Sequence, residues 1–73
     1  MIEKEFRIVY YDNLPGYFDG DYDVGTYFDS YTDAKIEAGT IRKSGQRCLI
    51  EVQEVEMENG EAVDHYGWSQ IPG

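Results

Sequence analysis

The chain has 73 residues, with 15 Asp and Glu against 6 Lys and Arg, so its formal net charge at pH 7 is -9. A domain of this size buries roughly 60% of its unfolded surface, and 41% hydrophobic residues suffice for one small core. The negative charge argues against binding to nucleic acid or to an anionic membrane, and it favours a basic partner.

The single cysteine, Cys48, excludes an intramolecular disulfide and is typical of a reducing compartment, so we expect a cytoplasmic protein. No apolar run approaches the about 18 residues of a membrane span. The acidic start at residues 1–5 lacks the basic region of a signal peptide. We therefore expect one soluble domain over residues 1–73.

The first strand is predicted over residues 5–11, where apolar side chains recur at every second position. One face of this strand carries Phe6, Ile8 and Tyr10. Val9 and Tyr11 partly fill the second face, which we expect to be half covered. Residues 13–16 contain Pro-Gly and are expected to turn, because Pro cannot donate to a strand ladder. Residues 17–23 are expected to form a loop, and 24–28 a second strand.

A helix is predicted over residues 30–44, with Ser30 as N-cap and Gly45 as its C-terminal stop. Its buried stripe is expected from residues at three- and four-residue spacing: Tyr31, Ala34, Ala38 and Ile41. Gly39 lies beside this stripe. Because glycine inside a helix costs about 1 kcal/mol relative to alanine, we expect Gly39 at a close contact with the sheet.

Two further strands are predicted over residues 47–57 and 62–71, joined by the hairpin turn Asn59-Gly60. In a regular two-residue hairpin, the opposed pairs are Glu51 with Trp68, Gln53 with Tyr66, and Glu54 with His65. The last residues, 71–73, are expected to fray. The fold class is therefore α+β, a small and mostly antiparallel sheet with one helix packed on one face, in the order β-β-α-β-β.

Acidic residues gather in two stretches without Lys or Arg, one between Arg7 and Lys35 and one after Arg47. Alternate residues of an extended segment lie about 6.6 Å apart, so each stretch can present a row of carboxylates. The rows are Asp19, Asp21 and Asp23, if that loop is extended, and Glu54, Glu56 and Glu58 on the third strand. This length scale resembles that of successive phosphates in a nucleic acid, so such rows can engage Lys and Arg that bind phosphates.

Aromatic residues are interleaved with the aspartates, and tyrosine is favoured in protein interfaces. Tyr17 and Tyr22 are therefore added to the two carboxylate rows as candidate partner-binding residues. The alternative is that the acidic residues form a solvated face that serves solubility.

Metal and catalytic motifs are weak in this sequence. The run Asp19-Gly20-Asp21-Tyr22-Asp23 matches the start of an EF-hand loop, but Val24 and Ser30 stand where Gly and a bidentate Glu are needed. A calcium- or ligand-binding domain stays open as a further alternative. Cys48 and His65 lie too far apart along the hairpin for a catalytic dyad, and Cys48 is expected in the core. We expect no enzyme activity, no cofactor and no metal.

A small acidic and aromatic domain with the row at residues 19–23, the row at 54–58 and a start at Met1 resembles the inhibitors encoded by phages and mobile elements. These are the anti-CRISPR and anti-restriction proteins, many of which are nucleic-acid mimics. The resemblance is compositional and implies a protein–protein inhibitor that occupies the basic nucleic-acid channel of a host defence nuclease. The alternative is a structural or regulatory domain that self-associates through the sheet face of Val9 and Tyr11.

Overall fold

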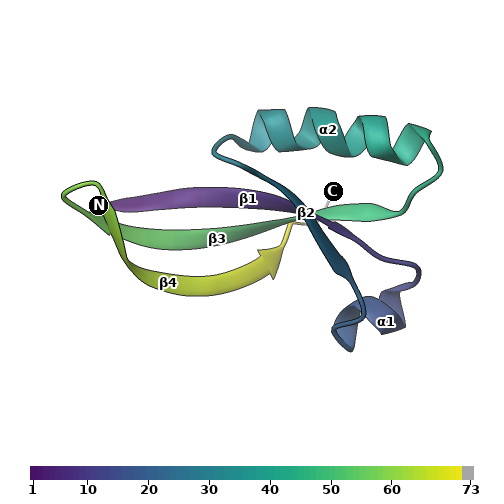
Figure 1. Cartoon of the computed structure of the whole chain (residues 1–73), viewed down its shortest axis with the longest axis horizontal. Coiled ribbons are helices and arrows are strands. Elements are labelled where there is room, and N and C mark those ends of the chain that lie inside the picture. The colour runs from purple at the N-terminus through teal and green to yellow at the C-terminus, as the bar shows by residue number, and fades with distance from the viewer. Residues whose placement is uncertain (72–73) are drawn as a thin grey trace.

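A four-stranded antiparallel sheet with the strand order β2-β1-β3-β4 forms the centre of the structure, a computed structural model that describes residues 1–71. Figure 1 shows its elements, and the molecule measures 41 × 26 × 18 Å. In chain order they are β1 (Ile2–Tyr10), α1 (Leu14–Phe18), β2 (Asp23–Phe28), α2 (Tyr31–Lys43), β3 (Cys48–Glu58) and β4 (Glu61–Gln70). The predicted α+β class is confirmed, with the short helix α1 as an addition.

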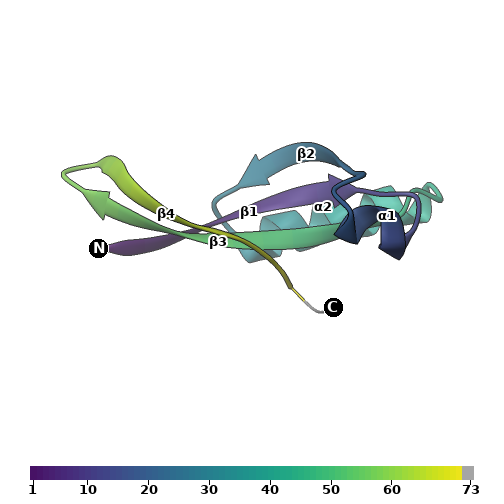
Figure 2. The same cartoon turned by 90° about the horizontal axis from the view of Figure 1, so that it is seen from below.

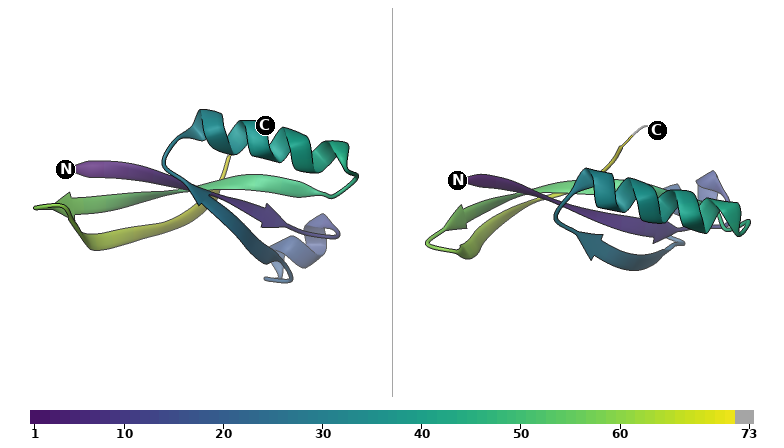
Figure 3. Two further views of the ribbon diagram at one scale, coloured as in Figure 1. Left: turned by 45° about the horizontal axis from the view of Figure 1, so that its top comes forward. Right: turned by 90° about the horizontal axis from the view of Figure 1, so that it is seen from above.

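Helix α2 covers one face of the sheet and closes the larger part of the core (Figures 1 and 3). As predicted, Ser30 caps α2, and its Oγ accepts a hydrogen bond from the N–H of Asp33 at 3.4 Å. Ala34 and Ala38 are fully buried against the sheet. The buried residues of this cluster are Phe6, Ile8, Ala34, Ala38, Cys48 and Ile50. The alternation in β1 and the buried position of Cys48 are thus confirmed.

The other face of the sheet carries a smaller cluster of Val9, Leu49 and Tyr17. Tyr17 comes from α1, in a segment predicted as turn and loop, so that prediction was wrong for residues 14–18. The reason is local. The Asn13 side chain accepts a hydrogen bond from the Gly16 N–H at 2.7 Å, and the fixed φ of Pro15 suits a first helical turn.

The β3–β4 hairpin follows the predicted register at its turn, where Glu58 faces Glu61 and Met57 faces Ala62. Further from the turn the prediction was wrong, because β4 contains two irregularities that shift the register. The observed pairs are Val55 with His65, Gln53 with Trp68 and Glu51 with Gln70. His65 therefore faces Val55 and not Glu54. A prediction that counts residues outward from the turn assumes a regular hairpin, so it does not include these shifts.

Gly67 lies in the second irregularity with φ +89, a backbone conformation that favours glycine. Gly39 has no atom of a neighbouring element within 4 Å of an added Cβ, so its predicted close contact with the sheet was wrong. Ile71 also differs from the prediction: its N–H donates to the Ile50 carbonyl at 2.9 Å and its side chain packs on the core. Residues 72 and 73, also predicted to fray, lie outside the described residues.

Strand β2 pairs with the second half of β1, from Phe6 to Tyr10, and ends there. The first half of β1 pairs with β3 alone. Figure 2 shows the result: β2, β1 and β3 form the end of the sheet that carries both helices, and β1, β3 and β4 form the other end. All four strands lie side by side only in the middle, at residues 6–7 of β1 and 51–52 of β3. We call the end formed by β1, β3 and β4, comprising residues 2–5, 52–58 and 61–69, the hairpin end.

Two alanine substitutions are predicted to have opposite effects on the free energy of unfolding. Gly67→Ala lowers it by about 1–2 kcal/mol, because an L-residue is strained at positive φ. Gly39→Ala raises it by about 0.5–1 kcal/mol, because the helix gains propensity and the added methyl meets no neighbour. Urea denaturation of the two variants measures both changes. A loss of stability in Gly39→Ala would contradict the open environment described for this position.

Candidate functional site: the carboxylates of the hairpin end

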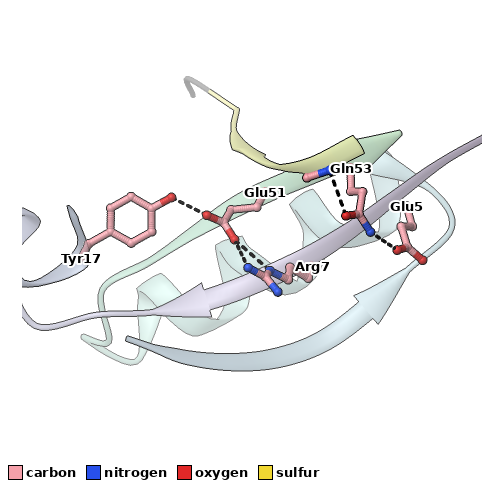
Figure 4. A network of polar contacts seen from close by, with 6 residues as sticks. Glu5, Arg7, Tyr17, Glu51 and Gln53 are labelled. Carbon is pink, nitrogen blue, oxygen red and sulfur yellow. Dashed lines mark hydrogen bonds and ion pairs between the residues drawn. The ribbon is translucent and has the colours of Figure 1, made fainter. Parts of the chain in front are cut away.

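A connected polar network lies on the sheet face opposite α2 (Figure 4). The Arg7 guanidinium donates to Glu51 Oε1 through Nε at 2.8 Å and through Nη2 at 2.7 Å. The Tyr17 hydroxyl donates to Glu51 Oε2. Glu51 is 5% exposed, so the whole group is withdrawn from water. These contacts attach α1 to the middle of the sheet.

The same face continues toward β4. Gln53 Nε2 donates to Glu5 Oε1 at 2.7 Å, and Gln53 Oε1 accepts from the N–H of Gly67 at 3.2 Å. The Arg7 guanidinium carbon lies 4.2 Å from the centre of the Trp68 ring, a cation–π contact. Within residues 1–71, every buried side-chain nitrogen and oxygen has a hydrogen-bond partner. The network is therefore satisfied internally and acts as a structural core for this face.

Tyr17 was predicted to contact a partner, and the structure places it elsewhere. Its side chain is 9% exposed, packs beside Tyr22 at 5.5 Å between ring centroids, and donates to Glu51. Burial, and then the hydrogen bond to Glu51 and the charge of Glu51, raise the pKa of the Tyr17 hydroxyl far above its usual range. Tyr17 serves the fold, and Tyr22 is half-buried against it.

The carboxylates predicted in the loop do not form a regular extended row. Asp19 is the C-cap of α1, and the N–H of Asp21 donates to the Gly16 carbonyl at 2.7 Å, so the chain wraps around the helix end. Asp23 then begins β2 opposite Tyr10. All three aspartates are exposed, but their spacing is irregular.

The second predicted row, Glu54, Glu56 and Glu58, does lie on one face of a strand, the face of β3 that α2 covers further along. Glu54 and Glu58 are exposed, and Glu56 is half-buried. Glu54 is the partner of Lys4, whereas Asp23 is the partner of Tyr10. Because Lys4 and Tyr10 are about 20 Å apart along β1, the two predicted groups occupy opposite ends of the sheet.

Strand β4 adds two carboxylates to this row that the sequence reasoning did not select. Glu61 lies directly opposite Glu58, and Asp64 lies directly opposite Glu56. Directly opposed like charges destabilise an antiparallel pair. Glu61 could have been selected, since it follows the Asn59-Gly60 turn directly. Asp64 could not, because its partner depends on the irregularity beside it.

Positive charge compensates only part of these five carboxylates, which we call the hairpin carboxylates: Glu54, Glu56, Glu58, Glu61 and Asp64. Lys4 of β1 lies directly opposite Glu54. The amino group of Met1 lies 3.0 Å from Glu56 Oε1. Among residues 1–71, the other ion pair within 4.0 Å is the buried Arg7–Glu51 pair, on the opposite face. The sequence holds no Lys or Arg after Arg47. The hairpin carboxylates thus present a net negative surface with internal repulsion.

Tyr66 stands among these carboxylates and is 57% exposed. Partial desolvation, followed by the charges of Asp64, Glu56 and Glu54, raises the pKa of its hydroxyl. An exposed aromatic side chain next to a net negative charge is a common composition for a protein-binding surface.

Other kinds of site find little support in the described part of the chain. No group of three or more His, Cys, Asp or Glu side chains within residues 1–71 is arranged to hold a metal ion. None of the helices described there is long and apolar enough to cross a membrane. Comparisons with known protein families, curated proteins and solved structures find no match to this chain. Its function is therefore inferred from its own residues.

The free energy of unfolding is predicted to depend on pH through the buried Tyr17 hydroxyl. Its pKa is raised in the folded state, so the unfolded chain loses this proton first, near pH 10. Folding stability from this group is present below pH 10 and falls above it, by at most about 1.4 kcal/mol per pH unit. The stability of the Tyr17→Phe variant is expected to fall less steeply over the same pH range.

Urea denaturation from about pH 8 to about pH 11 measures both curves. The thiol of Cys48, whose pKa is also raised by burial, is present in both proteins, so the difference between the curves isolates Tyr17. Parallel curves would contradict a buried, protonated Tyr17.

Proposed function

We propose that this protein is a small, non-enzymatic inhibitor that binds a basic, nucleic-acid-handling protein through its hairpin carboxylates. A cytoplasmic defence nuclease of the kind met by anti-CRISPR and anti-restriction proteins fits this description. The observation that carries the proposal is the pair of opposed like charges, Glu58 with Glu61 and Glu56 with Asp64.

Opposed carboxylates weaken the hairpin that holds them, and solubility does not require this arrangement. A solvated face can carry the same net charge with its acidic residues spread apart. Concentrating them on one strand pair creates a local negative potential, which steers a basic surface toward the hairpin end and is lowered by salt. The row therefore fits a charged partner better than it fits a purely solubilising role.

Self-association through the face of Val9 and Tyr11 receives less support from the structure. Val9 is fully buried beneath Tyr17 in the second cluster, and Tyr11 packs beside Tyr17 at 5.9 Å between ring centroids. The apolar surface expected on that face is thus already covered by this chain's own α1.

The test begins with capture of a partner from bacterial lysate, followed by binding of the purified partner in competition with labelled DNA or RNA. The wild type is expected to displace the nucleic acid, with an affinity that falls as salt rises. The variant Glu54→Gln, Glu56→Gln, Glu58→Gln is expected to lose at least tenfold in affinity and most of the salt dependence.

A matched control removes the same charge from the other end of the sheet: Asp19→Asn, Asp21→Asn, Asp23→Asn. It is expected to lose less than threefold, because a charge about 20 Å away is screened at physiological salt. Equal losses in the two variants would show that net charge alone acts, and would refute the assignment to the hairpin end. A partner that binds without displacing nucleic acid would refute the inhibitor mechanism.

A further inference from the structure

Helix α2 covers one half of its sheet face and leaves the other half open. The helix packs over Phe6, Ile8 and Ile50, near the end of the sheet that β2, β1 and β3 form. Figures 1 and 3 show that the hairpin end extends well beyond the first turn of α2. The same face of β1, β3 and β4 continues there without a helix above it.

The open half carries apolar side chains beside an oppositely charged pair, Lys4 and Glu54, which face each other across β1 and β3. A shallow depression of about 490 Å³ lies on it, lined by Lys4, Val52, Glu54, Tyr66, Gly67 and Ser69. Ile2, on the same face of β1, is 49% exposed, and Tyr66 is 57% exposed. In domains of this class a sheet face with apolar side chains is covered by a second layer. Here that layer is missing over Ile2 and Tyr66, and it covers Val52 only in part, at the margin of the cluster under α2.

We propose that this open half-face docks a basic, amphipathic α-helix of the partner protein, lying as a continuation of the layer that α2 begins. The inference rests on the proposed function and specifies the element of the partner that is bound. Three adjacent strands span about 10 Å from the first to the third, which is one helix diameter. From Val52 to Glu58 the face runs for about 20 Å, enough for roughly 13 helical residues.

Charge complementarity selects the occupant. Val52 and Tyr66 share the depression with the opposed pair of Lys4 and Glu54. Lys4 is the one cation in this lining, and the other hairpin carboxylates continue toward the tip, so the face is net negative: Glu56, Asp64, Glu58 and Glu61. An amphipathic helix with Lys or Arg beside its apolar stripe can bury Leu-like side chains on Val52 and Tyr66 while its cations meet these carboxylates. Nucleic acid is repelled by the same charges. A second copy of this chain, with net charge -9, is also disfavoured.

The test uses a synthetic probe of about 13 Leu and Lys residues with helical three- and four-residue spacing. A second probe has the same composition in strict two-residue alternation, and a third is oligolysine. Binding to the isotopically labelled protein is followed by NMR at low salt, which also reports whether each variant is folded. The helical probe is expected to bind at least tenfold more tightly than the others and to shift the signals of Ile2, Val52 and Tyr66.

Tyr66→Ala is expected to weaken binding of the helical probe about tenfold, the loss typical of removing one aromatic anchor from an interface. Ile36→Ala is the matched control, because Ile36 is a comparably exposed apolar residue, 65% exposed, on α2. It is expected to change binding less than twofold.

Three results would overturn the helix-docking inference. One is equal binding of the helical and alternating probes or oligolysine, and another is no effect of Tyr66→Ala; either leaves charge as the sole determinant. The third is a dimer in light scattering of the free protein that Tyr66→Ala dissociates, which would make a second copy the occupant. The nucleic-acid competition test does not depend on any of these results, so the proposed function can stand or fall separately.

Discussion

The buried ion pair between Arg7 and Glu51 is the interaction on which the second face of the sheet depends. Arg7 lies on β1 and Glu51 on β3, and the same carboxylate accepts the Tyr17 hydroxyl of α1 while Arg7 stacks on Trp68 of β4. One ion pair thus joins three strands and a helix on a face that α2 does not cover. A buried pair of this kind adds little net stability over apolar residues, but loss of one partner costs about 3–5 kcal/mol, because the other charge is left uncompensated.

Along its length, the sheet is divided into an end with a buried core and an end that is largely exposed. At the end that carries both helices, α2 on one face and the Arg7–Glu51 network on the other bury the core. No helix covers the hairpin end (Figure 1), and β4 is exposed along nearly its whole length. The opposed pairs, Glu58 with Glu61 and Glu56 with Asp64, therefore lie on the more exposed part of the sheet. The end with the buried core thus supports an end whose opposed carboxylates destabilise the strand pair that holds them.

The sequence predicted those elements whose signals are local. The cap at Ser30, the stop at Gly45, the alternation in β1 and the Asn59-Gly60 turn each depend on a few neighbouring residues, and each was found in the structure. The predictions were wrong where a contact with a residue distant in the sequence determines the local structure. Helix α1 is too short to show a periodicity, and Tyr17 is held by Glu51, more than thirty residues later in the chain. The register of β4 shifts at Gly67, where the backbone has positive φ and the N–H donates to the Gln53 side chain. The sequence alone does not show this contact. Of the candidate site, the row on β3 was predictable from strand spacing, whereas the facing Asp64 was not.

The hairpin carboxylates oppose the protein's own stability, and this effect can be measured without a partner. The variant Glu58→Gln, Asp64→Asn removes one charge from each opposed pair and keeps the contact of Glu56 with the Met1 amino group. Urea unfolding is compared at about 0.01 M and about 1 M salt, where the screening length falls from about 30 to about 3 Å. We expect the variant to be about 0.5–2 kcal/mol more stable than the wild type at low salt and the difference to shrink toward zero at high salt. A variant less stable than the wild type at low salt would show that these carboxylates stabilise the fold, and would contradict the repulsion inferred between the opposed pairs.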